Sequence, residues 1–434
     1  MNFYSMFVVL IGITLLMIVI FRGITPIIGA TTVAALIVLF SGIDFTDGMI
    51  NTYAGGFANM VKALAFMLIW GNVFGEMLVK TKSAETIAEW IAKLFGVKHC
   101  TWALMIISGI LAAGGMSYGG YIVTYHIGIV LCSRANYSKN IVIGAIFSGA
   151  WTFATLGPGM PSPQNALLQA NLGTASTAGL IPGLAACVAI FIANGIYMER
   201  QCISWQNKGI VFSAGDGLPV KDGSADEKRP HIIAAILPIV LVLVLYNFAK
   251  LNVAVSVLMG AISCFILNIR RFSLKEWLKL INDGALSCAL PLMNVSVMGG
   301  FGAVVALTAF YGDCLDALSA IDINPYILCI LSGNLFAGIM GSSTNGITLS
   351  MSAINPLLFR YAEQGYDIGN MHRLLALSSG GLDSLPHSPT FNSVCTLFHT
   401  TPKESYRPVF FTCTIIPILA SILIALPLAM LGLT

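Results

Sequence analysis

The chain has 434 residues, of which 57% are hydrophobic and only 9% charged, and its net charge is +3. Soluble domains carry about 25% charged residues, so this composition, with a mean hydropathy of +0.85, excludes a soluble globular protein. Long unbroken apolar runs also disfavour a membrane β-barrel, whose strands are short and alternating. The sequence therefore predicts an all-α protein that crosses a membrane many times.

Ten segments are apolar enough to cross a bilayer. In chain order they are 5–22, 24–42, 57–79, 140–172 (broken), 176–198, 231–248, 251–269, 284–310, 371–398 (broken) and 409–431. Two more apolar segments, 100–133 and 326–359, are interrupted by glycine-rich tips that leave arms of about 15 residues, too short to cross. We expect these two to be re-entrant hairpins, each entering and leaving on one side.

A polar stretch at 199–230 divides the chain into two similar halves, 1–198 and 231–434. When one half is slid over the other, small and turn-forming residues coincide: Gly115 with Gly341, Ser117 with Ser343, and Ser162-Pro163 with Ser388-Pro389. Duplicated halves are typical of secondary transporters. We expect a cytoplasmic linker between two repeats, each made of scaffold helices, one hairpin and one broken helix.

Basic residues are enriched in cytoplasmic loops of membrane proteins. With the N-terminus outside, most of the 22 Lys and Arg residues lie inside. Only Lys250, Arg360 and Arg373 are then expected outside, with Lys62 near a boundary. In this orientation the two repeats are inverted, so the hairpins enter from opposite faces and their tips meet near the midplane.

Four polar interruptions are expected at membrane depth: the tips 114–120 and 341–346, and the breaks 156–165 and 380–392. Backbone groups freed by Pro and Gly are tolerated there only where they line a cavity. Helix N-termini at such breaks carry partial positive charge, which suits an anion. Kinked packing of small residues is the alternative, but four interruptions in matching places favour a central binding site. None contains Lys or Arg, which suits a single carboxylate.

Asp383 and His387 are ionisable groups within the second break. Such residues in membrane spans are often proton relays, although a structural hydrogen-bonded pair is the alternative. A Ser/His/Asp hydrolase is disfavoured because the sequence has no nucleophile elbow. We therefore do not expect an enzyme. The ten cysteines are scattered without a metal-ligand spacing, so no metal site is expected either.

Residues 379–397, "SGGLDSLPHSPTFNSVCTL", resemble the signature segment of the gluconate permease family, within the larger ion-transporter superfamily. Residues 116–123, 157–168 and 341–354 also resemble family segments. The resemblance implies proton-coupled uptake of gluconate or a related small organic acid across the cell inner membrane, with no cofactor besides the coupling ion. Superfamily relatives imply a homodimer whose transport unit moves like an elevator. No nucleic-acid partner is expected.

The same resemblance points to Ser117, Tyr118, Gln164, Asn165, Thr344, Asn345, Asp383 and His387, and we add Ser388 and Asn392 of the second break to the predicted site. We expect Ser117, Thr344 and Asn345 to hold the carboxylate and Gln164, Asn165 and Asn392 to bind hydroxyls. Asp383, with His387, would take up and release the proton. A sodium-coupled carrier of di- or tricarboxylates, an amino-acid transporter and a channel remain alternatives at this point.

Overall fold

The computed structural model describes residues 3–22, 24–113, 118–213, 229–320, 323–398 and 400–434. Within them the chain forms helices and no strand, which confirms the all-α class. The first half contains α1 (Phe3–Phe21), α2 (Pro26–Phe40), η1 (Thr46–Tyr53), α3 (Ala54–Lys80), α4 (Ser83–Phe95), α5 (Cys100–Ala113), α6 (Tyr118–Ala135), α7 (Ile141–Trp151), α8 (Phe153–Leu156), α9 (Pro163–Leu172) and α10 (Leu180–Asn207).

The second half is also helical in its described residues. It contains α11 (Ile232–Asn247), α12 (Val253–Asn268), η2 (Ile269–Arg271), α13 (Leu274–Ser287), α14 (Ala289–Ala306), α15 (Ala309–Ala320), α16 (Pro325–Met340), α17 (Ser343–Glu363), α18 (Ile368–Ser379), η3 (Leu382–Ser384), α19 (Pro389–Leu397), α20 (Pro402–Val409), η4 (Phe410–Ile415), α21 (Ile416–Ala420), η5 (Ser421–Ala425) and α22 (Leu426–Met430). The inverted relation between the halves stays a prediction.

Both predicted breaks are interruptions of a helix at Gly and Pro. In the first half, α8 ends at Leu156, directly before Gly157-Pro158, and α9 begins at Pro163. In the second half, α18 ends before two glycines and α19 begins at Pro389. Proline lacks the N–H that continues a helix but fits its first turn, so each break ends where a new helix can begin.

The two predicted hairpins are pairs of packed helices, α5 with α6 and α16 with α17. The second hairpin turns at Gly341, whose positive φ of 58° favours glycine. Its arms approach closely, because a Cβ added to Gly346 would lie 2.5 Å from the Cα of Ala337. The re-entrant course of these hairpins in the bilayer stays a prediction.

The long helices α3 and α14 lie in contact, each covered by two helices of the other half. The helices α12 and α13 pack on α3, and α2 and η1 pack on α14, while α11 and α1 lie beside α12 and α2. Glycines permit the close crossing of the long helices, since a Cβ on Gly56 would lie 2.7 Å from the carbonyl oxygen of Gly299. Small residues at such crossings are typical of membrane helices.

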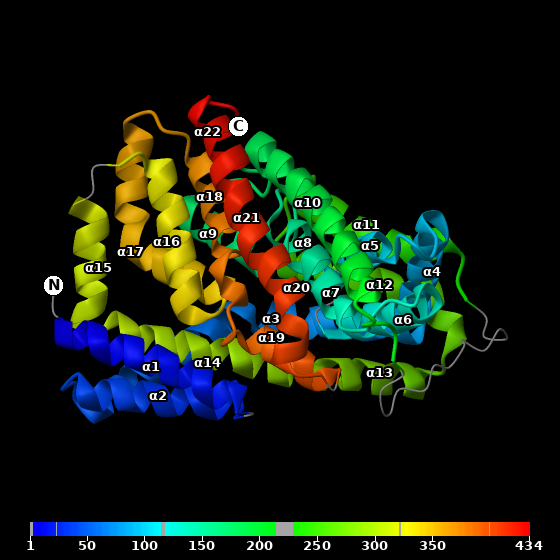
Figure 1. Cartoon of the computed structure of the whole chain (residues 1–434), viewed down its shortest axis with the longest axis horizontal. Helices are drawn as coiled ribbons and strands as arrows, with labels where there is room; N and C mark the ends of the chain where they lie inside the picture. Colours follow the sequence, from blue (N-terminus) through cyan, green and yellow to red (C-terminus); the bar gives the residue numbers. More distant parts are fainter. Residues whose placement is uncertain (1–2, 23, 114–117, 214–228, 321–322, 399) are drawn as a thin grey trace.

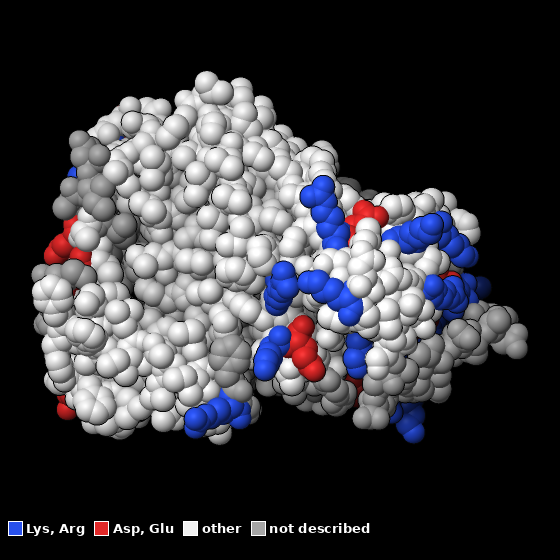
Figure 2. All heavy atoms as spheres, in the orientation of Figure 1, with Lys and Arg blue, Asp and Glu red and all other residues white. Residues whose placement is uncertain are grey.

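The hairpins lie toward opposite ends of the long axis, with the broken helices between them (Figure 1). Figure 2 shows most of the Lys and Arg of this face gathered over the end that carries α4, α6 and α13, with several Asp and Glu among them and others at the opposite end. The orientation of the chain in the membrane stays a prediction.

Six helical stretches of the described chain are long and apolar enough to cross a bilayer unaided, and shorter apolar helices accompany them. The expected spans at 24–42 and 231–248 are among the shorter ones, with 15 residues in α2 and 16 in α11. The number of ten spans therefore stays a prediction.

Candidate functional site

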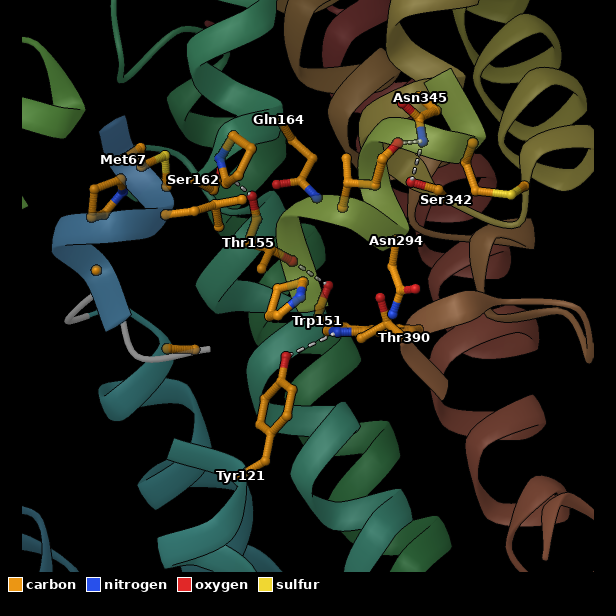
Figure 3. Close-up of a pocket in the computed structure, with 18 of the residues that line it drawn as sticks. Met67, Tyr121, Trp151, Thr155, Ser162, Gln164, Asn294, Ser342, Asn345 and Thr390 are labelled. Atoms are coloured by element: carbon orange, nitrogen blue, oxygen red, sulfur yellow. Dashed lines mark hydrogen bonds between the residues drawn. The ribbon is translucent and has the colours of Figure 1, made fainter. Parts of the chain in front are cut away.

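A cavity of about 180 Å³ lies between α3 and α14 on one side and the interrupted segments on the other (Figure 3). The described residues that line it include no charged side chain. Its polar groups are Thr155, Ser162 and Gln164 of the first break, Ser342 and Asn345 of the second tip, Asn294 of α14, Thr390 of α19, and the aromatic pair Tyr121 and Trp151.

The wall formed by the first break is fixed by its own hydrogen bonds. The hydroxyl of Ser162 donates to the carbonyl of Thr155 at 2.6 Å and accepts from the backbone N–H of Asn165 at 3.2 Å. The Thr155 hydroxyl donates to the carbonyl of Trp151, whose indole N–H in turn donates to Tyr121 (Figure 3). This part of the cavity is therefore held in one shape before any solute enters.

Two helices begin at the cavity. Ser162 precedes α9 and Ser342 precedes α17, and both serines line the cavity. The first N–H groups of a helix have no partner within the helix and carry partial positive charge. The cavity thus offers an anion two helix N-termini: that of α9, where Ser162 caps one N–H, and that of α17, which has no side-chain cap. In this conformation the hydroxyl or amide donors of Thr155, Ser162, Gln164 and Asn345 are engaged within the protein.

Ser343 connects the first break to the second. The amide nitrogen of Gln164 donates to the Ser343 hydroxyl at 2.7 Å. The hydroxyl and backbone N–H of Ser343 also lie beside the carboxylate of Asp383, which is only 7% exposed. A change in the charge of Asp383 therefore acts directly on a residue that holds the cavity wall.

Asp383 and His387 themselves do not line the cavity. The ring of His387 is buried against Gly341 and the last turn of α16. Both predicted coupling residues thus contact the tip of the second hairpin from within the second break. Their role in coupling stays a prediction.

Of the predicted substrate residues, Gln164 and Asn345 line the cavity. The amide nitrogen of Asn345 donates to the carbonyl of Val295 at 3.2 Å and to the hydroxyl of Ser342 at 3.4 Å. Thr344 is buried in the first turn of α17, beside the lining residues. Ser117 and the side chain of Tyr118 lie outside the residues that the structure describes.

Three further predicted residues hold the breaks together in this conformation. The amide nitrogen of Asn165 donates to the carbonyls of Gly157 and Met160, each at 3.0 Å, and the side chain is fully buried. The amide of Asn392 donates to the carbonyls of Pro386 and Ser388. Ser388 is itself buried against Gly341. Contacts of these residues with a substrate stay a prediction.

The side of the membrane on which Arg373 lies stays a prediction. The structure buries Arg373 completely against the first break, although the four interruptions themselves contain no Lys or Arg. Its guanidinium donates to the side-chain oxygen of Asn165 at 3.0 Å and to the carbonyl of Leu156. The distribution of charges over loops cannot show that α18 packs against α9. A His-Arg pair within an otherwise apolar segment was the signal that could have revealed it.

Other residues of the site were also missed. Ser343 occupies the position that the repeat matches to Ser117, so the duplicated pattern contained that signal. Asn294 is the one amide side chain in the apolar run 289–306. A polar side chain within a membrane span often marks a functional site or a contact between helices. Ser342 lies within the second tip and Thr155 directly precedes the first break, but no sequence pattern marked either of them as a site residue.

Replacing Ser343 with Ala is expected to lower uptake by about tenfold, because it leaves the buried amide of Gln164 without its acceptor. Ser343→Thr retains a hydroxyl and is expected to keep most of the activity. Ser352→Ala on the same helix removes an exposed hydroxyl and serves as the control. Initial rates in membrane vesicles measure all three, and wild-type rates in Ser343→Ala would show that the Gln164–Ser343 contact is dispensable.

A sequence profile of the GntP family of permeases matches residues 4–429. The chain belongs to this family. It is a permease rather than an enzyme, and a multi-pass protein of the cell membrane. Segments that resemble the gluconate permease signature are thus confirmed as family segments.

Named relatives span most of the chain. A protein of Bacillus subtilis called the uncharacterized transporter YxjC is 24% identical, with 94% of this chain and 95% of the relative covered. The gluconate permease of Zymomonas mobilis is 22% identical over 81% of this chain and 82% of its own. A high-affinity gluconate transporter of Escherichia coli is 24% identical over 54% of this chain and 53% of its own.

Among solved structures, the YdaH transporter of Alcanivorax borkumensis is similar in fold. The TM-score is 0.55, with 14% sequence identity and 90% of each chain covered. That structure is described as having an unusual topology. At this identity the likeness shows the fold alone.

Proposed function

We propose that this member of the GntP family is a proton-coupled symporter for a small organic monocarboxylate, gluconate or a related sugar or hydroxy acid. The observation that carries the proposal is the uncharged polar cavity where the first break meets the second hairpin tip. Asp383 does not line this cavity but contacts Ser343, the neighbour of the lining residue Ser342. Relatives named gluconate permease and L-idonate transporter support a sugar-acid substrate.

The chemistry of the cavity favours a monoanion with hydroxyl groups. Two helix N-termini attract one carboxylate, while Thr155, Gln164 and Asn345 present hydroxyl and amide groups to the rest of the solute. The cavity volume of about 180 Å³ is comparable with the roughly 150 Å³ that accommodates benzene. A small solute therefore fits, whereas a peptide or lipid does not.

Coupling is proposed to act through Asp383. A proton taken up from outside neutralises the carboxylate beside Ser343, and release of that proton inside restores the charge. Because Ser343 also accepts the hydrogen bond of Gln164, protonation changes the cavity wall at the N-terminus of α17. His387, buried against the same tip, is proposed to take part in this transfer.

The position of the cavity supports an elevator-type movement. One wall comes from Met67, Leu68 and Gly71 of α3 and from residues 291–298 of α14, and the other from the breaks and tip. If α3 and α14 belong to a fixed scaffold in a homodimer, sliding of the hairpins and broken helices carries the site past them. Alternating access then exposes one site to each face in turn.

Sodium is the alternative coupling ion, and one feature favours it. Buried oxygens of Gln164, Asn345 and Asp383 have no hydrogen-bond partner in the described part of the chain. Oxygen atoms of amides and carboxylates are ligands for hard cations. A sodium-coupled carrier of carboxylates or amino acids would use these groups around the second tip.

Uptake of radiolabelled gluconate into proteoliposomes tests the proposal. We expect accumulation with an inward proton gradient, no stimulation by an inward sodium gradient at fixed pH, and inhibition by related sugar acids. Unlabelled hydroxybutyrate, serine and citrate serve as competitors that identify the substrate class. Accumulation that requires sodium and ignores the proton gradient would contradict the proposed coupling.

A further inference from the structure

Arg373 is a buried cation that the proposed transport cycle does not yet use. Its side chain is fully buried, and its guanidinium donates to the carbonyls of Leu156, Ser176 and Ala178 as well as to Asn165. Leu156 is the last residue of α8, where helix carbonyls lack partners and carry partial negative charge. These contacts satisfy the hydrogen bonds of Arg373 but do not neutralise its charge.

No carboxylate partners this charge in the described part of the chain. The ionisable neighbours of Arg373 there are His372, Cys187 and Tyr246. An arginine remains protonated in proteins, and burying a charge without a counter-ion is costly. This cost suggests that the positive charge of Arg373 has a function that a neutral side chain could not fulfil.

The surrounding helices are shaped to hold Arg373. A Cβ on Gly179 would lie 2.4 Å from the Cβ of Arg373, and one on Gly183 would lie 2.7 Å from its Cδ. Next to it, His372 is hydrogen-bonded to Thr174 at 2.6 Å and lies 3.3 Å from the side-chain oxygen of Asn165. The position is therefore a built site for a guanidinium and not a chance burial.

The guanidinium contacts two residues that directly follow lining residues of the cavity in the chain. Leu156, which accepts from it, follows the lining residue Thr155, and Asn165 follows the lining residue Gln164. The described lining residues carry no charge, so the charges that act on the cavity come from behind them: Arg373 at the first break and the carboxylate of Asp383 beside Ser343. Electrostatic forces extend over several ångströms in a low-dielectric interior.

We propose that Arg373 determines the charge selectivity of the cavity, favouring an anionic over a neutral solute through its field and through the position of Asn165. This proposal rests on the proposed carboxylate transport. It makes Arg373 a positioning residue that does not touch the substrate. The chemical class it selects is a monocarboxylate, as opposed to the corresponding amide or alcohol.

The test compares the dissociation constants of gluconate and gluconamide, which share their hydroxyl groups but differ in charge, on purified protein. Wild-type protein is expected to prefer gluconate. In Arg373→Gln both affinities should fall with the loss of the fork of donors, and the ratio of the gluconate affinity to the gluconamide affinity should fall by about tenfold or more. A merely structural role would weaken both ligands equally, and an unchanged gluconate preference in Arg373→Gln would overturn the proposal.

Two further measurements apply if Arg373→Gln does not fold. Arg373→Lys keeps the charge but not the fork of donors, so both affinities should fall while their ratio is preserved. In wild-type protein, the ratio should persist from about 0.02 M to about 0.5 M salt, because a buried charge is poorly screened. Loss of the preference for gluconate over gluconamide in either measurement would assign the selectivity to other charges.

Equal binding of the acid and the amide by wild-type protein would instead contradict carboxylate selectivity itself, and with it the proposed function.

Discussion

Asp383→Asn is expected to abolish accumulation driven by a proton gradient while leaving exchange of internal for external substrate. The amide keeps the size of the carboxylate beside Ser343 but cannot take up and release a proton. Accumulation in proteoliposomes should fall by about tenfold or more, within the range of typical coupling between two sites. Counterflow of labelled substrate, measured without any gradient, should remain.

The matched control is Asp283→Asn, an exposed aspartate on α13. It removes the same charge away from the breaks, so both accumulation and exchange should stay at wild-type levels. Full proton-driven accumulation in Asp383→Asn would show that another group carries the proton. Loss of exchange together with accumulation would instead indicate that Asp383 is needed for the shape of the site.

Gly149→Ala is expected to have the largest effect on stability. Gly149 lies in α7 where this helix crosses α5, and a Cβ there would be 2.0 Å from the backbone oxygen of Met105. Backbone cannot move aside as a flexible side chain can, so the helices must separate, and overpacking of this kind costs about 1–3 kcal/mol or more. We expect the apparent melting temperature in detergent to fall by about 5 °C or more.

Gly55→Ala in α3 is the control, because nothing lies within 4 Å of the added Cβ. Alanine is the better helix former by about 1 kcal/mol, so this variant should be as stable as wild type or slightly more stable. A Gly149→Ala protein that melts with wild-type behaviour would show that α5 and α7 are less closely packed than the structure has them.

The interruptions of the helices could be predicted from the sequence because they depend on local chemistry. Pro163 begins a helix and Gly341 ends one, as the missing N–H of proline and the free φ of glycine favour, and both breaks and both helix pairs of the hairpins are found at the predicted segments. The arms were expected to have about 15 residues; α5 and α16 have 14 and 16, whereas α6 and α17 have 18 and 21.

Contacts between segments distant in the sequence could not be predicted in this way. Arg373 and Asn165 are 208 residues apart, and only the packing of α18 on α9 shows that one is the partner of the other. Counting basic residues placed Arg373 on the outer side but could not show its burial, because that rule weighs the charge of each side and contains no term for packing. Packing also decides the contacts of Asn165. The sequence predicted that its amide binds a substrate hydroxyl, but in this structure the amide nitrogen donates to two backbone carbonyls of the protein.

The link from Gln164 through Ser343 to Asp383 was hidden for a related reason. Each residue belongs to a different interruption, and their convergence depends on how the second hairpin tip meets both breaks. The alignment of the two halves does match Ser343 to Ser117, a predicted site residue. Comparison of the halves could therefore have added Ser343 to the predicted site.

An electron-microscopy structure of the protein with the acid that uptake competition identifies tests the central claim most directly. We expect density for the solute in the cavity bounded by Thr155, Gln164 and Ser342, with its carboxylate toward the N-termini of α9 and α17. Density at another place in the protein, with this cavity empty, would contradict the account.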